Sequence, residues 1–153
     1  MTQSSLFSDP PAPRSSGFEV IANVDGGARG NPGPAAYGVV IRDAQGKVVM
    51  ELSKYLGIQT NNVAEYSGLL AALEYAAQAK YESIKVISDS ELLVRQMQGR
   101  YKVNHPVLKQ LFDKAKLLTE SFHLFRIEHV LREKNKDADR LVNEVLDRQA
   151  KAR

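Results

Sequence analysis

The hydrophobic pattern of the chain changes its period after the first third, and this change limits the folds that the chain can adopt. Apolar and polar residues alternate in FEVIANVD (18–25), AYGVVIRD (36–43) and KVVMELSKYL (47–56), as is typical of strands. From Val63 to about residue 79 the apolar residues recur at helical spacing instead. The first half therefore predicts an antiparallel meander of three strands followed by a long helix.

The second half of the chain alternates strands with helices. SIKVIS (83–88) and FHLFRIEHVL (122–131) predict two further strands, and helices are expected at about 89–98, 106–119 and 136–148. Helical connections place the later strands parallel to the first. The pattern predicts an α/β fold with a mixed five-stranded sheet, an antiparallel meander plus two parallel strands, flanked by helices.

Length and composition indicate one folded domain with a tail. The 153 residues, 43% of them hydrophobic, suit a single domain over residues 18–150. Residues 1–17 are rich in Ser and Pro, and we expect them to form a disordered tail. No apolar stretch approaches the roughly 20 residues that span a bilayer. The lack of cysteine excludes disulfides and thiolate ligands, and we expect a cytoplasmic protein.

The formal charge of +3 is unevenly distributed. Residues 95–116 contain six lysines and arginines but one acid, Asp113. Such a segment is either a solvated helix face or a surface that contacts phosphates.

Four acidic residues fall at positions where a ligand site of an α/β sheet is expected. Asp25 is predicted at the end of the first strand, and Asp89 directly follows the fourth. Glu65 is predicted in the first turn of the first long helix, and Asp139 near the start of the last. Ligands of such sheets collect at the carboxyl ends of parallel strands.

Each of these acids also has a local explanation. Asp25 can form a turn, Asp89 can cap a helix, and acids near helix starts are favoured by the helix dipole. If all four converge, however, their charges repel strongly unless cations lie between them. Convergence therefore predicts a divalent metal site with oxygen ligands.

Four segments in order resemble the motifs of the type 1 ribonuclease H family: VDGGARGNPGPAAYG, TNNVAEYSGLLAALE, ISDSELLVRQMQG and REKNKDADRLVNE. The resemblance covers residues 21–147. It implies a ribonuclease H-like fold and a ribonuclease H that hydrolyses the RNA strand of RNA–DNA hybrids, leaving 5′-phosphate and 3′-hydroxyl ends.

The resemblance also implies roles for the four acids. Two Mg²⁺ or Mn²⁺ ions are expected, and the metal ligands, which are also the catalytic residues, are Asp25, Glu65, Asp89 and Asp139. Asp25 would bridge the two ions. Asp89 and Glu65 would hold the ion at the leaving group, and Asp139 the ion at the attacking water.

Further residues are expected to contact the hybrid. By the resemblance, Gly30, Asn31, Asn61 and Asn62 lie in its minor groove, where RNA presents its 2′-hydroxyls. Helix capping is the alternative for the last two. The long basic insertion of some family members is missing here. Arg100 and Lys102, in the short connection that replaces it, are therefore the candidates for holding phosphates of the DNA strand.

The loop before the last acid also departs from those family members, because it has no histidine. Arg132 or Asn135 is the candidate for its auxiliary role. The RNA–DNA hybrid is the expected partner, and we expect a monomer with neither a membrane nor an obligate protein partner.

Other classes of protein share parts of this pattern. A non-catalytic or differently targeted nucleic-acid-binding module of the same fold is the main alternative. A proofreading-type exonuclease is disfavoured, because Asp25 is followed by Gly26 and Gly27 rather than by the Asp-x-Glu pattern expected there. An actin-like ATPase would need a second phosphate loop and a far longer chain.

Overall fold

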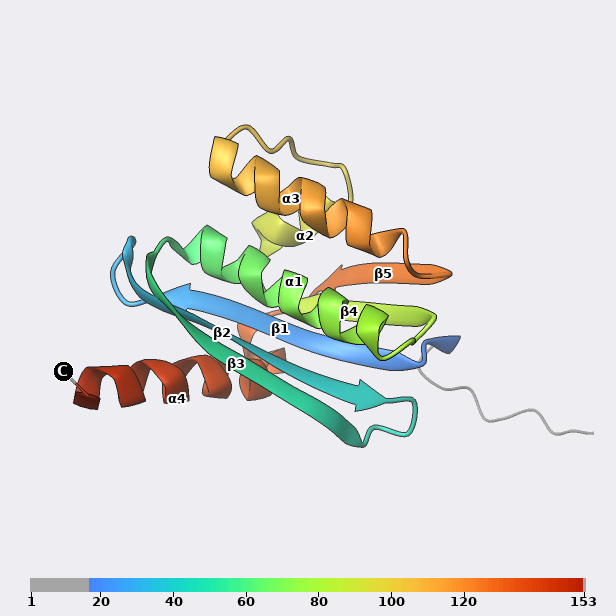
Figure 1. Cartoon of the computed structure of the whole chain (residues 1–153), viewed down its shortest axis with the longest axis horizontal. Helices are drawn as coiled ribbons and strands as arrows, with labels where there is room; N and C mark the ends of the chain where they lie inside the picture. The colour runs from blue at the N-terminus through green and yellow to red at the C-terminus, as the bar shows by residue number, and fades with distance from the viewer. Residues whose placement is uncertain (1–16, 153) are drawn as a thin grey trace, which may run out of the picture.

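The computed structural model describes residues 17–152 and contains one five-stranded sheet (Figure 1). The strands are β1 (Val20–Ala28), β2 (Gly33–Asp43), β3 (Val48–Gln59), β4 (Ser83–Ser88) and β5 (Leu124–His129). Their order in the sheet is β3-β2-β1-β4-β5. The pairs β1–β2 and β2–β3 are antiparallel, and the pairs β1–β4 and β4–β5 are parallel. The predicted meander and the two parallel strands are confirmed.

Helices cover both faces of this sheet (Figure 1). They are α1 (Asn61–Gln78), α2 (Glu91–Met97), α3 (Pro106–Thr119) and α4 (Lys136–Ala152), and a short 3₁₀ turn, η3 (Arg132–Lys134), precedes the last. The helices α1, α2 and α3 lie on one side and α4 lies alone on the other. None of the helices in residues 17–152 has both the length and the apolar character needed to cross a membrane.

The two faces of the sheet bury cores of different size. Alternate residues of β1, such as Val20 and Val24, pack with Leu69 and Leu73 of α1 in the larger core. On the other face, α4 buries a small cluster formed by Ala36 of β2 with Val142, Val145 and Leu146. The amphipathic pattern of α4 therefore has a narrow apolar stripe and a broad polar face, and Asp139 lies on its first turn.

Two glycines bring one helix on each face into close contact with the sheet. A Cβ atom on Gly26 of β1 would lie 2.3 Å from the backbone of Ala64 in α1. A Cβ atom on Gly38 of β2 would lie 2.5 Å from the carbonyl oxygen of Ala138 in α4. Gly38 is the register partner of Asp25 in the β1–β2 pair. The backbones of α1 and α4 thus approach the sheet beside this aspartate, from opposite sides.

The predicted tail, residues 1–17, lies outside the described residues except for Gly17. The predicted boundary between a tail and a folded domain therefore stays a prediction.

The contact at Gly38 predicts a large effect of a single methyl group. Gly38→Ala should lower the free energy of unfolding by about 1–3 kcal/mol, because its Cβ would force α4 away from β2. Gly27→Ala is the matched control, since its Cβ would meet Val142 Cγ1 at an ordinary 3.9 Å. The control should change stability by less than about 0.5 kcal/mol in urea denaturation. Equal stability of the two variants would contradict the role given to Gly38.

Candidate active site

Asp25 lies where β1 is still paired with its antiparallel neighbour β2 but no longer with its parallel neighbour β4. Strand β1 pairs with β2 as far as Ala28, but its pairing with β4 ends at Val24 and Ser88. The prediction that Asp25 ends its strand is therefore wrong, because the pairing with β2 continues past it. Asp25 and Asp89 are instead the first residues beyond the parallel pair. The two strands separate there, and this creates the crevice in which ligands of such sheets bind.

The other two acids come from helices on opposite faces. Glu65 is the fifth residue of α1, so its predicted place in the first turn is wrong. The contact of Gly26 with the Ala64–Glu65 backbone holds this residue against β1. Asp139 lies in the first turn of α4, as predicted. The sheet and both helix layers thus contribute to one cluster.

Helix capping, the local explanation for Asp89 and for Asn61 and Asn62, does not hold. Thr60 caps α1, because its hydroxyl accepts a hydrogen bond from the Val63 N–H at 3.2 Å. Ser90 caps α2 in the same way, through the N–H of Leu93. Neither Asp89 nor the Asn61–Asn62 pair is used as an N-cap. Their side chains are therefore available for other contacts.

The four acids line one open cleft. Oxygen atoms of Asp25, Glu65 and Asp89 lie within 4.8 Å of one another. Asp139 lines the same cleft, which has a volume of about 330 Å³. Within the described part of the chain, Oε1 of Glu65 is buried and has no hydrogen-bond partner. A buried polar atom left without a partner costs roughly 1–3 kcal/mol.

Burial and mutual repulsion dominate the electrostatics of the cleft. Burial, together with the neighbouring carboxylates of Asp89 and Asp139, raises the pKa of Asp25 to about 8. Burial and the charge of Asp25 raise the pKa of Glu65 well above its ordinary value. Burial also raises the pKa of Asp89, although the guanidinium of Arg132 opposes this shift.

This donor set fits a divalent cation. Closely spaced carboxylate oxygens, one of them unpartnered, are suited to hard cations such as Mg²⁺ or Mn²⁺. A cation between the carboxylates would supply the missing partner of Glu65 and would favour the ionised form of each acid.

The two auxiliary candidates occupy different places. Arg132 lines the cleft with the acids. Asn135 is only 1% exposed, and both ends of its amide are engaged with β1. Its Nδ2 donates to the carbonyl oxygen of Val24 at 2.9 Å, and its Oδ1 accepts from Nδ2 of Asn23 at 2.9 Å. Asn135 therefore fastens the start of α4 to the residue before Asp25, and Arg132 is the candidate that faces the cleft.

The Gly-rich loop is tied to the start of α1. The N–H of Asn61 donates to Oδ1 of Asn31 at 2.9 Å, and Oδ1 of Asn61 accepts from the N–H of Ala28 at 2.8 Å. Gly30 allows the turn between Ala28 and Asn31, because its φ of +94° favours glycine. Asn62 follows as the second residue of α1.

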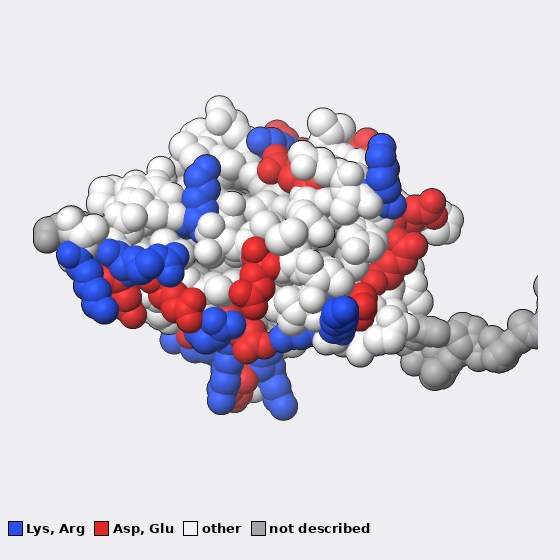
Figure 2. Space-filling model, turned by 60° about the horizontal axis from the view of Figure 1, so that its bottom comes forward, with Lys and Arg blue, Asp and Glu red and all other residues white. Residues whose placement is uncertain are grey.

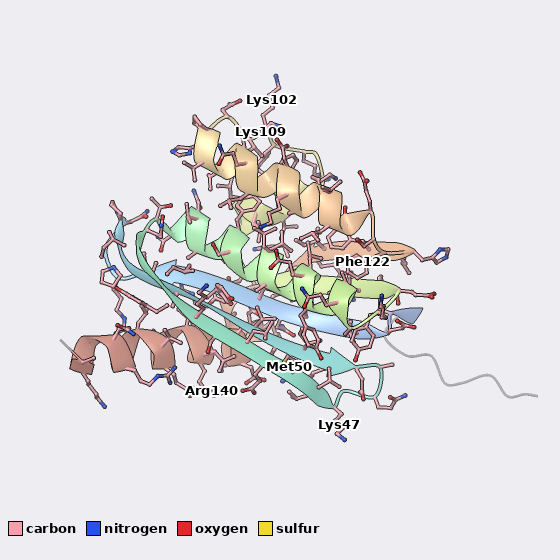
Figure 3. All side chains as sticks on the ribbon, viewed as in Figure 1. Lys47, Met50, Lys102, Lys109, Phe122 and Arg140 are labelled. Carbon is pink, nitrogen blue, oxygen red and sulfur yellow. The ribbon has the colours of Figure 1, made fainter. Side chains whose placement is uncertain are left out.

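The remaining candidates lie away from the cleft. Arg100 and Lys102 belong to the connection between α2 and α3 and are exposed. Figure 3 shows Lys102 and Lys109 on the α3 side of the molecule, opposite the side that carries Lys47 and Arg140. The structure does not bring Arg100 and Lys102 to the four acids.

The sequence interpretation missed two residues at the cleft, Arg29 and Asn143. Asn143 lies four residues after Asp139, the spacing that places two residues on the same helix face. That spacing is the one signal that pointed to it. Arg29 gave no local signal, because the partners of its side chain lie more than a hundred residues away in sequence.

Comparisons with known proteins agree with this architecture. The family model described as "Reverse transcriptase-like" matches residues 23–145. The bifunctional protein Rv2228c of Mycobacterium tuberculosis is 44% identical over 136 residues, covering 88% of this chain. Ribonuclease HI of Halobacterium salinarum is 43% identical over 131 residues, covering 86% of this chain. This chain spans 37% of the length of the first relative and 66% of the second.

Solved structures of ribonucleases H are similar to this chain in both fold and sequence. The N-terminal RNase H domain of Rv2228c superposes with a TM-score of 0.84 at 43% identity, covering 88% of this chain and 98% of that one. LC11-RNase H1, in a complex with an RNA/DNA hybrid, superposes with a TM-score of 0.81 at 47% identity, covering 86% of this chain and 99% of that one. The family match, the two relatives and these structures agree with the mixed five-stranded sheet and its helices. The chain therefore belongs to the type 1 ribonuclease H family.

Proposed function

We propose that this chain is a ribonuclease H that cleaves the RNA strand of RNA–DNA hybrids endonucleolytically, leaving 5′-phosphate and 3′-hydroxyl ends. The observation that carries this proposal is the carboxylate cluster at the point where β1 and β4 separate, with an unpartnered oxygen of Glu65 inside it. The similarity to a ribonuclease H1 solved with an RNA/DNA hybrid supports this substrate.

The four carboxylates are suited to hydrolysis of a phosphodiester. Two divalent cations, Mg²⁺ or Mn²⁺, would supply an activated water and would neutralise the charge on the leaving oxygen. Asp25, at the centre of the cluster, would contact both cations. Glu65 and Asp89 would share the cation at the leaving 3′-oxygen, and Asp139 would serve the one at the attacking water. Arg132 would take the auxiliary role beside Asp89.

The asparagines near the cleft are suited to minor-groove contacts. The side-chain Oδ1 atoms of Asn31 and Asn61 both accept hydrogen bonds from backbone N–H groups of the protein. Their Nδ2 groups have no hydrogen bond among the described residues, so they can donate to 2′-hydroxyls or to base edges. Gly30 and Asn62 complete this surface at the Gly-rich loop and the start of α1. The surface would recognise the shape of the hybrid and not its sequence.

The cytoplasmic location and the monomeric state expected from the sequence stay predictions. A non-catalytic nucleic-acid-binding module remains the alternative, and cleavage assays distinguish it.

Cleavage of a labelled RNA–DNA hybrid tests the proposed activity. The parent chain should cleave the RNA strand with Mg²⁺ or Mn²⁺, and a chelator should abolish cleavage. Asp89→Asn should be inactive but bind the hybrid, because it loses a metal ligand and keeps the side-chain shape. Glu144→Gln is the matched control outside the cleft and should keep activity. Asp89→Asn activity within a few-fold of the parent would contradict the assignment, and hybrid binding without cleavage by the parent would favour the alternative.

The raised pKa of Asp25 predicts how stability depends on pH without metal. The folded state keeps a proton on Asp25 up to about pH 8, whereas the ordinary pKa is 3.8. Because the folded state binds more protons in this range, the free energy of unfolding should fall as pH rises from 4 to 8. Glu65 and Asp89 act in the same direction.

Urea denaturation in a chelator at about pH 5.5 and about pH 8.5 measures this effect. The parent should be less stable at the higher pH, and Asp25→Asn should show a smaller decline. Added Mg²⁺ should restore the parent at the higher pH, since it favours the ionised carboxylates. The same decline in parent and variant would mean that Asp25 is not responsible.

The basic segment 95–116 is our candidate for holding the DNA strand. Replacing both Arg100 and Lys102 by Ala should raise KM more than it lowers kcat, because neither residue lines the cleft. The slope of log affinity against log salt should decrease by roughly 1 for each phosphate that the variant no longer neutralises. The matched control replaces Lys47 and Arg140 on the opposite side (Figure 3). If both double variants keep the parent slope, residues 95–116 are a solvated face, and Arg132, Lys134 and Lys136 become the candidates.

A further inference from the structure

Arg29 is a charged residue of the cleft for which the proposed function has no role. It follows the end of β1 and reaches across to α4. Its Nη2 donates to Oδ1 of Asn143 at 3.1 Å and lies 2.8 Å from Oδ1 of Asp147. Asn143 and Asp147 lie one and two helical turns after Asp139. The guanidinium therefore connects the Gly-rich loop to the helix that carries the fourth acid.

Asn143 continues this connection to Asp139. Its Nδ2 lies 3.1 Å from the backbone oxygen of Asp139 and 3.3 Å from Oδ2 of the same residue. An asparagine amide has an acceptor at one end and donors at the other. Arginine can only donate, so its contact with Oδ1 fixes which end of the amide faces Asp139. Without Arg29 the amide could turn over and present its oxygen to a carboxylate.

Asp139 depends on such a contact more than Asp25 and Glu65 do. The Oε1 atom of Glu65 is buried, and Asp25 is part of the sheet. Asp139 is only half-buried and comes from α4, which packs on the sheet through the smaller core. Its carboxylate lies outside the group of three whose oxygens are within 4.8 Å of one another. Its other close neighbour in the cleft is the carboxylate of Asp25, which repels it when both are ionised, so the amide of Asn143 is a neutral donor suited to orienting it.

We propose that Asn143 and Arg29 are positioning residues that hold the carboxylate of Asp139 in its metal-binding orientation. Asn143 contacts Asp139 directly, and Arg29 acts through Asn143. The inference rests on the proposed function, since it assigns Asp139 a cation. Two simpler roles compete with it. Arg29 could contact the substrate itself, or its exposed pair with Asp147 could be a surface salt bridge worth at most about 1 kcal/mol.

A double-mutant cycle separates these roles. Arg29→Ala and Asn143→Ala should each lower kcat roughly 10-fold with little change in KM, the usual size of an effect on residues that support metal ligands. The double variant should be no worse than Asn143→Ala, because Arg29 acts through that residue. Arg29→Lys should recover part of the activity, since an ammonium can also donate to Oδ1. Additive losses, or a loss carried by KM, would overturn the proposal in favour of direct substrate contact.

Binding of Mn²⁺ alone, followed by calorimetry, gives a readout that does not need activity. Loss of a nearby positive charge would by itself tighten cation binding. The proposal instead expects Arg29→Ala and Asn143→Ala to bind Mn²⁺ roughly 10-fold more weakly than the parent. Weaker binding supports the proposal whether or not the hybrid is cleaved. Binding that is unchanged or tighter overturns it, even if the proposed ribonuclease activity is confirmed.

Arg140→Ala is the matched control for both measurements. Arg140 lies on α4, as Asn143 does, and carries the same charge as Arg29. It pairs with Glu51 and Glu144 away from the cleft (Figure 3). The face that carries α4 mixes acidic and basic side chains (Figure 2), so loss of one arginine there is a fair measure of a general charge effect. The control should keep the parent's kcat and Mn²⁺ affinity. Losses equal to those of Arg29→Ala would overturn the proposal.

Discussion

The close approach of two helix backbones to the sheet is the constraint on which the rest of the site depends. Gly26 admits α1 from one face, and Gly38 admits α4 from the other. Asp25 lies between them, next to Gly26 in sequence and opposite Gly38 in register. Because side-chain carboxylates are short, their oxygens meet only if the backbones that carry them are this close. The absence of a side chain at Gly26 and at Gly38 therefore determines where the four carboxylates can converge.

Such convergence has an electrostatic cost in the protein alone. Burial and mutual repulsion raise the pKa of Asp25, Glu65 and Asp89, and an oxygen of Glu65 stays without a partner. Contacts elsewhere offset this cost: the larger core buries α1, and Asn135 joins the start of α4 to β1. The fold thus holds the carboxylates in an arrangement that they would not adopt by themselves. A site prepared in this way needs little rearrangement when a cation binds.

The strands, the helices and the position of Asp139 could be predicted from the sequence, because they depend on the local pattern of apolar and polar residues. The change of hydrophobic period predicted the meander and the parallel strands, and the position of Asp139 followed from the start of its helix. The prediction for Asp25 failed because strand ends depend on pairing with two neighbours, which need not stop together. Contacts such as that of Arg29 with Asn143 join residues 114 apart in sequence, and no local pattern encodes them.

The attachment of α4 has a consequence for the motions of the protein. This helix packs through a small apolar cluster, whereas α1 is embedded in the main core. Segments that bury less apolar surface open at a lower free energy than the rest of a domain, often as a unit. Amide hydrogens of α4 should therefore exchange with solvent before those of β1 and α1. Opening of α4 would remove one carboxylate and leave three in place, so the cluster would change its number of ligands without global unfolding.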